Sequence, residues 1–137
     1  MYSRHLALLL PVLLWGCSTA RPPRDTAAQS PPETVLITYH VKPGREAELE
    51  KILSRAWEIY RQERLVFAEP HVIVRDQGKS GQPRMIEIFT WISHDAPDHA
   101  PASVKTIWGE MMSFCEARDG QGAIEGGEVE IIQSSRK

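Results

Sequence analysis

The stretch TVLITYHVKPGREAELEKIL, residues 34–53, holds a strand pattern followed at once by a helix pattern. Residues 34–41 are rich in β-branched and aromatic side chains, which favour β-strands. Pro43 and Gly44 then mark a turn. From Arg45 to Arg64 apolar side chains recur at helical spacing with charges between them, which indicates an amphipathic helix. The folded part of the chain is therefore expected to begin with a strand and a helix.

The remaining sequence repeats this alternation. HVIVR (71–75) follows Pro70 and has a strand pattern, as does RMIEIFTWIS (84–93), and the turn-rich link 76–83 predicts a hairpin between them. A second helical stripe runs from Pro101 to Cys115, and EVEIIQ (128–133) is the predicted last strand. This order predicts an α+β, ferredoxin-like βαββαβ fold, in which two helices cover one face of a four-stranded antiparallel sheet.

The N-terminal region differs from the rest. LALLLPVLLW (6–15) is an apolar run of ten residues, too short for a membrane-spanning helix but of the length found in signal peptides. LLWGCS (13–18) resembles the lipobox of bacterial lipoproteins. That resemblance implies cleavage before Cys17, lipid attachment at Cys17, and a place in the cell envelope. Ser18 after the cysteine favours the periplasmic side of the outer membrane, again by resemblance.

These patterns divide the chain into a signal peptide (1–16), a lipidated cysteine with a Pro-rich tether (17–33) and one folded domain (34–137). Residues 18–33 contain four prolines and no aliphatic side chain larger than alanine, a composition that cannot form a core. Once Cys17 is lipidated, Cys115 has no partner for a disulfide. The formal net charge of -2 gives no reason to expect a nucleic-acid partner.

Alternation along the strands separates two faces of the predicted sheet. The more uniformly apolar set is assigned to the helix side. The other set mixes polar groups with large apolar ones, so a second subunit is expected to cover it and form a homodimer. The helix-side set is Val35, Ile37, Tyr39, Val41, Val72, Val74, Ile86, Ile88, Ile92, Val129 and Ile131; the open set is Leu36, Thr38, His40, His71, Ile73, Arg75, Met85, Glu87, Phe89, Trp91, Glu128, Glu130 and Ile132.

Three segments resemble one family. Residues 34–53, EIFTW (87–91) and HAPASVKTIWGEMMSFCEARDG (99–120) are similar to the antibiotic-biosynthesis-monooxygenase superfamily of dimeric α/β barrels. The resemblance implies the fold and a homodimer. Its members include cofactor-free oxygenases of polycyclic phenols, haem-degrading oxygenases and proteins with no known activity. Both kinds of oxygenase use an asparagine, and this sequence contains none.

The segment EIFTWISHDAPDHAP (87–101) concentrates the candidate site residues. Strand adjacency predicts that His40 and Glu87 share a face, as a base and its orienting carboxylate. Trp91 and His99 match positions that the resemblance assigns to haem-degrading sites. Each also has a structural interpretation, as a packed aromatic, an interface pair or a helix start. The expected pocket is therefore His40, Glu87, Trp91 and His99, lined further by Thr38, His71 and Phe89.

Three function classes remain open at this point. The preferred one is a lipid-anchored domain that binds a small apolar or aromatic ligand without catalysis. The second is a cofactor-independent monooxygenase of a phenolic substrate, with His40 as the base. The third is a protein that binds or degrades haem through His99. No metal site is expected, because His94 and His99 are not spaced to share a helical face. No cofactor is expected either, apart from the haem of the third class.

Overall fold

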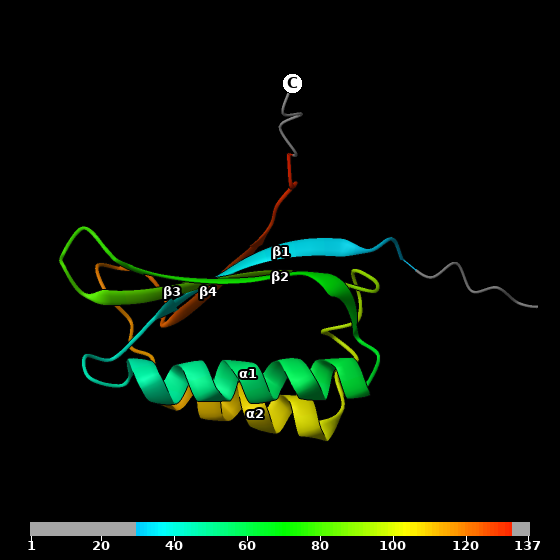
Figure 1. The fold of residues 1–137 in the computed structure, drawn as a ribbon, viewed down its shortest axis with the longest axis horizontal. Coiled ribbons are helices and arrows are strands. Elements are labelled where there is room, and N and C mark those ends of the chain that lie inside the picture. Colours follow the sequence, from blue (N-terminus) through cyan, green and yellow to red (C-terminus); the bar gives the residue numbers. More distant parts are fainter. Residues whose placement is uncertain (1–29, 133–137) are drawn as a thin grey trace, which may run out of the picture.

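The computed structural model describes residues 30–132 and has the predicted βαββαβ order. Its strands are β1 (Glu33–His40), β2 (Val66–Gln77), β3 (Pro83–Trp91) and β4 (Ile124–Glu128), and its helices are α1 (Glu46–Gln62) and α2 (Ala102–Ser113). The strands form one antiparallel sheet in the order β2-β3-β1-β4. Both helices lie on the same face of it (Figure 1). The predicted fold class is confirmed.

The predicted element bounds agree with the structure except in β2 and β4. Pro43 and Gly44 separate β1 from α1 as expected, and Gly44 has a φ of +80°, which favours glycine. Acidic residues in the first turn of α1, Glu46 and Glu48, and Arg61 in its last turn suit the helix dipole. No helix among residues 30–132 is long and apolar enough to cross a membrane.

The last strand is β4, which lies at 124–128 and not at the predicted 128–133. Its sequence IEGGE has no strand alternation, and glycines usually weaken a strand. Here the glycine allows a close approach, because a Cβ atom at Gly126 would lie only 2.7 Å from Cδ1 of Ile37. The backbone of this segment can therefore pair with β1 directly beside the Ile37 side chain.

Strand β2 begins five residues earlier than predicted and is irregular. Its register against β3 shifts between Val66 and His71, around Pro70. Proline cannot donate a hydrogen bond to the ladder, so an interruption at this residue is expected. After the shift, His71 pairs with Phe89 and Ile73 pairs with Glu87.

The predicted face assignment is correct for β1 but reversed for β2 and β3. Val35, Tyr39 and Val41 are buried on the helix side, as expected. Residues opposite each other on neighbouring strands share a face, and Val35 pairs with Phe89. Thus Met85, Glu87, Phe89 and Trp91, which were assigned to the open face, are buried under the helices.

The face turned away from the helices carries aliphatic side chains at its centre. Leu36 pairs with Ile88, which pairs with Val72, and Ile86 pairs with Val74. Val72 and Val74 are 45% and 46% exposed. We call this set the outer face: Leu36, Val72, Val74, Ile86 and Ile88. It is open in a single chain, and its composition differs from the aromatic face that the sequence predicted.

Candidate ligand-binding site

A cavity of about 420 Å³ lies between the sheet and α2. Strands β1 and β3, both helices and the loop before α2 all contribute to its wall. Its lining is mainly aliphatic and aromatic: Glu33, Val35, Ile37, Tyr39, Tyr60, Phe89, Trp91, Pro97, Trp108, Met111, Met112 and Ile124. Natural ligand pockets share this volume range and this apolar character.

Aromatic rings from three elements form one side of this cavity. The ring centroids of Phe89 and Trp91 are 4.9 Å apart, those of Tyr60 and Trp91 are 5.3 Å apart, and those of Trp91 and Trp108 are 6.4 Å apart. The Phe89–Trp91 and Trp91–Trp108 contacts are edge-to-face, an arrangement that aromatic pairs favour. Phe89 and Trp91 share the helix side because they are two residues apart on β3, while Tyr60 comes from α1 and Trp108 from α2.

Two of the lining residues form a hydrogen bond at the wall of the cavity. The indole Nε1–H of Trp108 donates to the hydroxyl oxygen of Tyr60 at 2.6 Å. Burial raises the pKa of Tyr60 well above its usual value, and the bond from Trp108 offsets this only in part. The Tyr60 hydroxyl therefore remains protonated throughout the physiological pH range.

A buried polar chain begins at the cavity and continues beneath β2. The hydroxyl of Tyr39 donates to Oε2 of Glu87 at 2.7 Å, and Nε2 of His71 lies 2.9 Å from Oε1 of the same carboxyl group. The His71 ring stacks on Trp57 with centroids 3.7 Å apart. Glu87 is 1% exposed. Burial, and next the charge of Glu87, raise the pKa of Tyr39 well above its usual value.

The predicted site residues divide into three groups. Phe89 and Trp91 line the cavity, and Glu87 and His71 lie next to it through the bond to Tyr39. Thr38 does not line it, because it pairs with Ile86 and so belongs to the outer side of the sheet. Two of the seven predicted residues therefore line the cavity, and two more are linked to its wall through the hydrogen bond to Tyr39.

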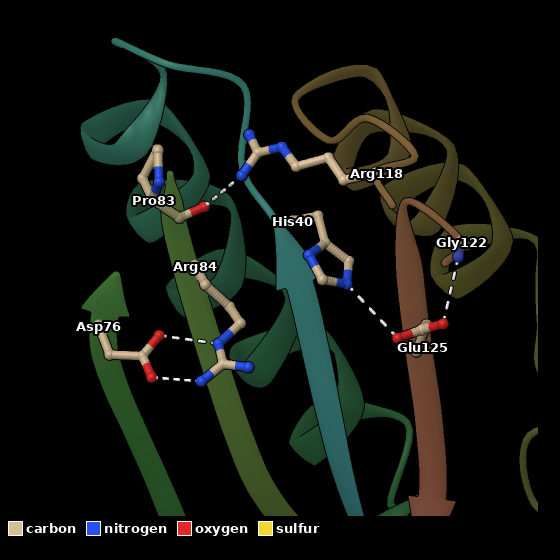
Figure 2. A network of polar contacts seen from close by, with 7 residues as sticks. All are labelled: His40, Asp76, Pro83, Arg84, Arg118, Gly122 and Glu125. Carbon is tan, nitrogen blue, oxygen red and sulfur yellow. Dashed lines mark hydrogen bonds and ion pairs between the residues drawn. The ribbon is translucent and has the colours of Figure 1, made fainter. Parts of the chain in front are cut away.

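The predicted pair of His40 and Glu87 is wrong. Glu87 pairs with Ile37 and therefore shares its face of the sheet. Ile37 and His40 lie an odd number of residues apart on β1, so the side chains of Glu87 and His40 project from opposite faces. Figure 2 shows His40 beside Glu125, and Nε2 of His40 lies 3.4 Å from Oε2 of Glu125. Nearby, Arg84 donates two hydrogen bonds to Asp76, and these hold the pKa of the Asp76 carboxyl below its usual value (Figure 2). His40 thus belongs to a polar cluster outside the cavity.

The segment between β3 and α2 consists of turns and bends. His99 is exposed, and its backbone N–H donates to the carbonyl of Asp95. His94 is also exposed, with Nδ1 3.2 Å from Oε2 of Glu33. Residues 30–132 contain no cluster of three or more potential metal ligands. Cys115 is buried, and burial raises the pKa of its thiol to about 11.

Sequence reasoning missed the contributions of Tyr39, Tyr60 and Trp108. Each follows the apolar stripe of its strand or helix, so its periodicity is that of an ordinary core residue. A hydroxyl or indole N–H on such a stripe needs a hydrogen-bond partner once it is buried. That requirement was the available signal, although it could not identify the partner.

Comparison with solved structures confirms the fold implied by the resemblance. SnoaB, a cofactor-independent oxygenase from Streptomyces nogalater, aligns over 79% of this chain and 100% of its own, with a TM-score of 0.55 and 18% identity. A putative antibiotic biosynthesis monooxygenase from Caulobacter crescentus aligns over 77% of this chain and 92% of its own, with a TM-score of 0.52 and 19% identity. Another putative antibiotic biosynthesis monooxygenase, from Bacteroides thetaiotaomicron, aligns over 78% of this chain and 95% of its own, with a TM-score of 0.54 and 14% identity. At these identities the similarity establishes the fold alone.

The sequence itself matches no model of a protein family, and a comparison with curated proteins found no match. The solved structures alone show that the chain has the fold of antibiotic-biosynthesis-monooxygenase proteins. The predicted lipoprotein signal, including Cys17, lies outside residues 30–132.

Proposed function

We propose that this domain binds a small apolar or aromatic ligand in the cavity between the sheet and α2. The observation that carries the proposal is the lining, which joins aliphatic side chains from β1 to the aromatic wall of Phe89, Trp91 and Trp108. Burial of an apolar ligand there removes apolar surface from water, which favours binding by roughly 25 cal/mol of free energy per Å² buried. No step of this function needs His40 or His99.

Filling the cavity should weaken ligand binding. We expect Val35→Phe to weaken binding of the neutral fluorescent probe N-phenyl-1-naphthylamine at least about tenfold, because Val35 lines the cavity and the larger ring occupies ligand space. Probe fluorescence measures the affinity. The matched control is Val72→Phe, the same substitution on the outer face, which should leave binding unchanged. Equal losses in both variants, with both folded by circular dichroism, would refute the cavity as the binding site.

Lipid attachment at Cys17 is the second part of the proposal. The motif LLWGCS and the short apolar run before it support a lipoprotein of the bacterial envelope, with its folded domain on the periplasmic side of the outer membrane. Two or three acyl chains anchor a protein stably, whereas one does not. We expect a clickable palmitate analogue to label the wild type and not Cys17→Ser. Label on the variant, or release of the wild type as soluble protein, would count against the anchor.

A cofactor-independent oxygenase of a phenolic ligand is the alternative. It is favoured by the chain of Tyr39, Glu87 and His71, which could carry a proton away from the cavity wall, and SnoaB is named as such an enzyme. Oxygen uptake with a panel of phenols, lost in Glu87→Gln, would favour it over simple binding. Haem binding receives no such support, because His99 is exposed and does not line the cavity.

A homodimer is the expected assembly. The outer face offers aliphatic side chains on three adjacent strands, and such a face is seldom left to solvent. Two copies that place these faces together would bury them. The sequence analysis placed Phe89 and Trp91 in the dimer interface, but both are buried under the helices and are not available for contact with a partner.

A further inference from the structure

A second pocket, of about 370 Å³, lies apart from the apolar cavity. It is situated at the end of β1, between the turn that joins β2 to β3 and the loop that precedes β4. Its titratable lining consists of His40, Lys79, Arg84, Arg118 and Asp119, and glycine, serine and glutamine residues complete it. No residue within 30–132 lines both this pocket and the apolar cavity. We call it the turn pocket.

A tight turn fixes one wall of the turn pocket. Arg118 and Gln121 exchange two backbone hydrogen bonds, of 3.1 and 2.7 Å. Between them Asp119 and Gly120 have φ angles of 51° and 80°, the left-handed conformation that a two-residue turn of this kind requires and that Asp-Gly pairs favour. The shape of this wall therefore exists before any ligand binds.

Arg118 joins the walls of the pocket and contributes its charge. Its side chain is 11% exposed. Nη1 donates to the carbonyl of Pro83 at 3.1 Å, Nη2 donates to the carbonyl of Val41, and Nε donates to Oε1 of Glu116 at 3.0 Å (Figure 2). These bonds hold the loop before β4 against the end of β1 and the start of β3. Arg118 is thus a positioning residue whose donors are largely used within the chain.

Arg84 keeps one edge of its guanidinium group open. A guanidinium group carries five N–H donors and can bind planar carboxylates along more than one edge. Asp76 occupies the edge formed by Nε and Nη2 (Figure 2). Nη1 has no hydrogen-bond partner within residues 30–132, so the edge formed by Nη1 and Nη2 is left for a second carboxylate. Arg84 lines the turn pocket, which is where that carboxylate would lie.

His40 offers a ring nitrogen to the same pocket. The residue is 7% exposed, and Nε2 is the ring atom that faces Glu125. Nδ1 has no partner within residues 30–132, yet no side-chain nitrogen or oxygen in that part of the chain is both sealed from solvent and unpaired. Nδ1 is therefore reachable, and the turn pocket is the space that His40 lines. A hydroxyl group suits it in either tautomer, because a hydroxyl both donates and accepts.

The surrounding charges favour a monoanion over a dianion. Asp76, Glu116 and Glu125 each pair with a lining residue, and Asp119 lines the pocket itself. These four carboxylates repel a dianion such as a phosphate monoester. Lys79 forms no ion pair within residues 30–132, so its charge is not offset by a direct partner. One carboxylate is the anion that this balance accommodates best.

We propose that the turn pocket binds a small hydroxylated carboxylic acid, such as a sugar acid. The open edge of Arg84 and the ammonium group of Lys79 bind the carboxylate. Nδ1 of His40 and the side-chain amides of Gln82 and Gln121 form hydrogen bonds with the hydroxyl groups. This site is separate from the apolar cavity, and its ligand is of the opposite polarity.

Three matched sugars test the proposal. D-glucuronate, D-glucose and D-glucose 6-phosphate share one ring and differ in the group at C6: a carboxylate, a hydroxymethyl or a phosphate ester. We use residues 18–137, which retain the complete sheet, both helices and the core described above. NMR titration of the Gln121 backbone amide and the Arg84 Nε–H signals gives the affinities. We expect glucuronate to bind about tenfold more tightly than glucose and about threefold more tightly than glucose 6-phosphate.

Three outcomes with the wild-type chain would overturn the proposal. They are equal binding of glucuronate and glucose, tighter binding of glucose 6-phosphate than of glucuronate, and the absence of glucuronate binding at millimolar concentration. Shifts confined to the Trp108 indole N–H would also overturn it, because they would place the sugar acid in the apolar cavity.

Variants of two cationic residues locate the carboxylate. Arg84→Gln should weaken glucuronate binding about tenfold, and Lys79→Gln, on an exposed turn where folding is unaffected, about threefold. The matched control is Arg75→Gln, which breaks a similar ion pair, with Glu50, but does not line the turn pocket, and it should bind glucuronate as the wild type does. Equal losses in Arg84→Gln and Arg75→Gln, or no loss in Lys79→Gln, would contradict the site. Binding of N-phenyl-1-naphthylamine should be unchanged in all three variants, so the two sites are tested separately.

Discussion

Glu87→Ala should lower the free energy of unfolding by about 3 kcal/mol, measured by urea denaturation. The carboxyl group is 1% exposed and joins the Tyr39 hydroxyl to the His71 ring. Truncation leaves the buried Tyr39 hydroxyl without its acceptor, and it leaves the His71 ring, which is 19% exposed, without its carboxylate partner. It also removes packing beneath α1, where His71 stacks on Trp57.

Two further glutamate variants separate hydrogen bonding from other effects. Glu87→Gln keeps the shape and an acceptor oxygen, so it should cost only about 1 kcal/mol. Glu50→Ala removes an exposed partner of Arg75 and should change stability by less than about 0.5 kcal/mol. A loss in Glu87→Ala no larger than that in Glu50→Ala would mean that the buried chain contributes nothing to the fold.

Val74→Lys should raise the dissociation constant of the homodimer about 100-fold. Val74 lies on the outer face, 46% exposed in the single chain. A twofold interface contains each side chain twice, and each buried valine contributes roughly 1.5 kcal/mol, so the two copies together account for about two orders of magnitude. Sedimentation equilibrium of residues 18–137 at micromolar concentration measures the change.

The matched control for the dimer is Thr106→Lys. Thr106 is exposed on α2, on the opposite side of the molecule from the outer face, and gains the same charge. It should sediment as the wild type does. A wild type that is monomeric at micromolar concentration would contradict the dimer, as would dissociation of equal extent in the two lysine variants.

The element order was predictable because helices and strands leave different periodicities. The stripes of Leu49, Ile52, Leu53 and Ala56 on α1, and of Val104, Ile107 and Met111 on α2, are buried as their spacing predicts. The sequence analysis misplaced strand β4 because the position of this strand depends on the absence of a side chain at Gly126, where Ile37 approaches. Hydrophobic patterns cannot report such a requirement.

The site was only partly predictable because β3 is apolar on both faces. Met85, Phe89 and Trp91 alternate with Ile86 and Ile88, so alternation alone does not identify the helix side. The polar residue Glu87 favoured the open face, and its buried partners come from distant parts of the chain. The placement of His40 on the outer side of the sheet follows from the register of β1 with β3. This register depends on how the two strands pair in the folded chain, and it cannot be read from the sequence of one strand.

The position of a bound ligand decides whether the cavity is the functional site. Intermolecular nuclear Overhauser effects between N-phenyl-1-naphthylamine and the protein would locate it. We expect contacts with the methyl groups of Ile37 and Met111 and with the ring protons of Trp108, all of which line the cavity. Contacts confined to the outer-face methyl groups of Val74 and Ile86 would contradict the proposed function, because the ligand would then occupy the sheet surface and leave the cavity without a role.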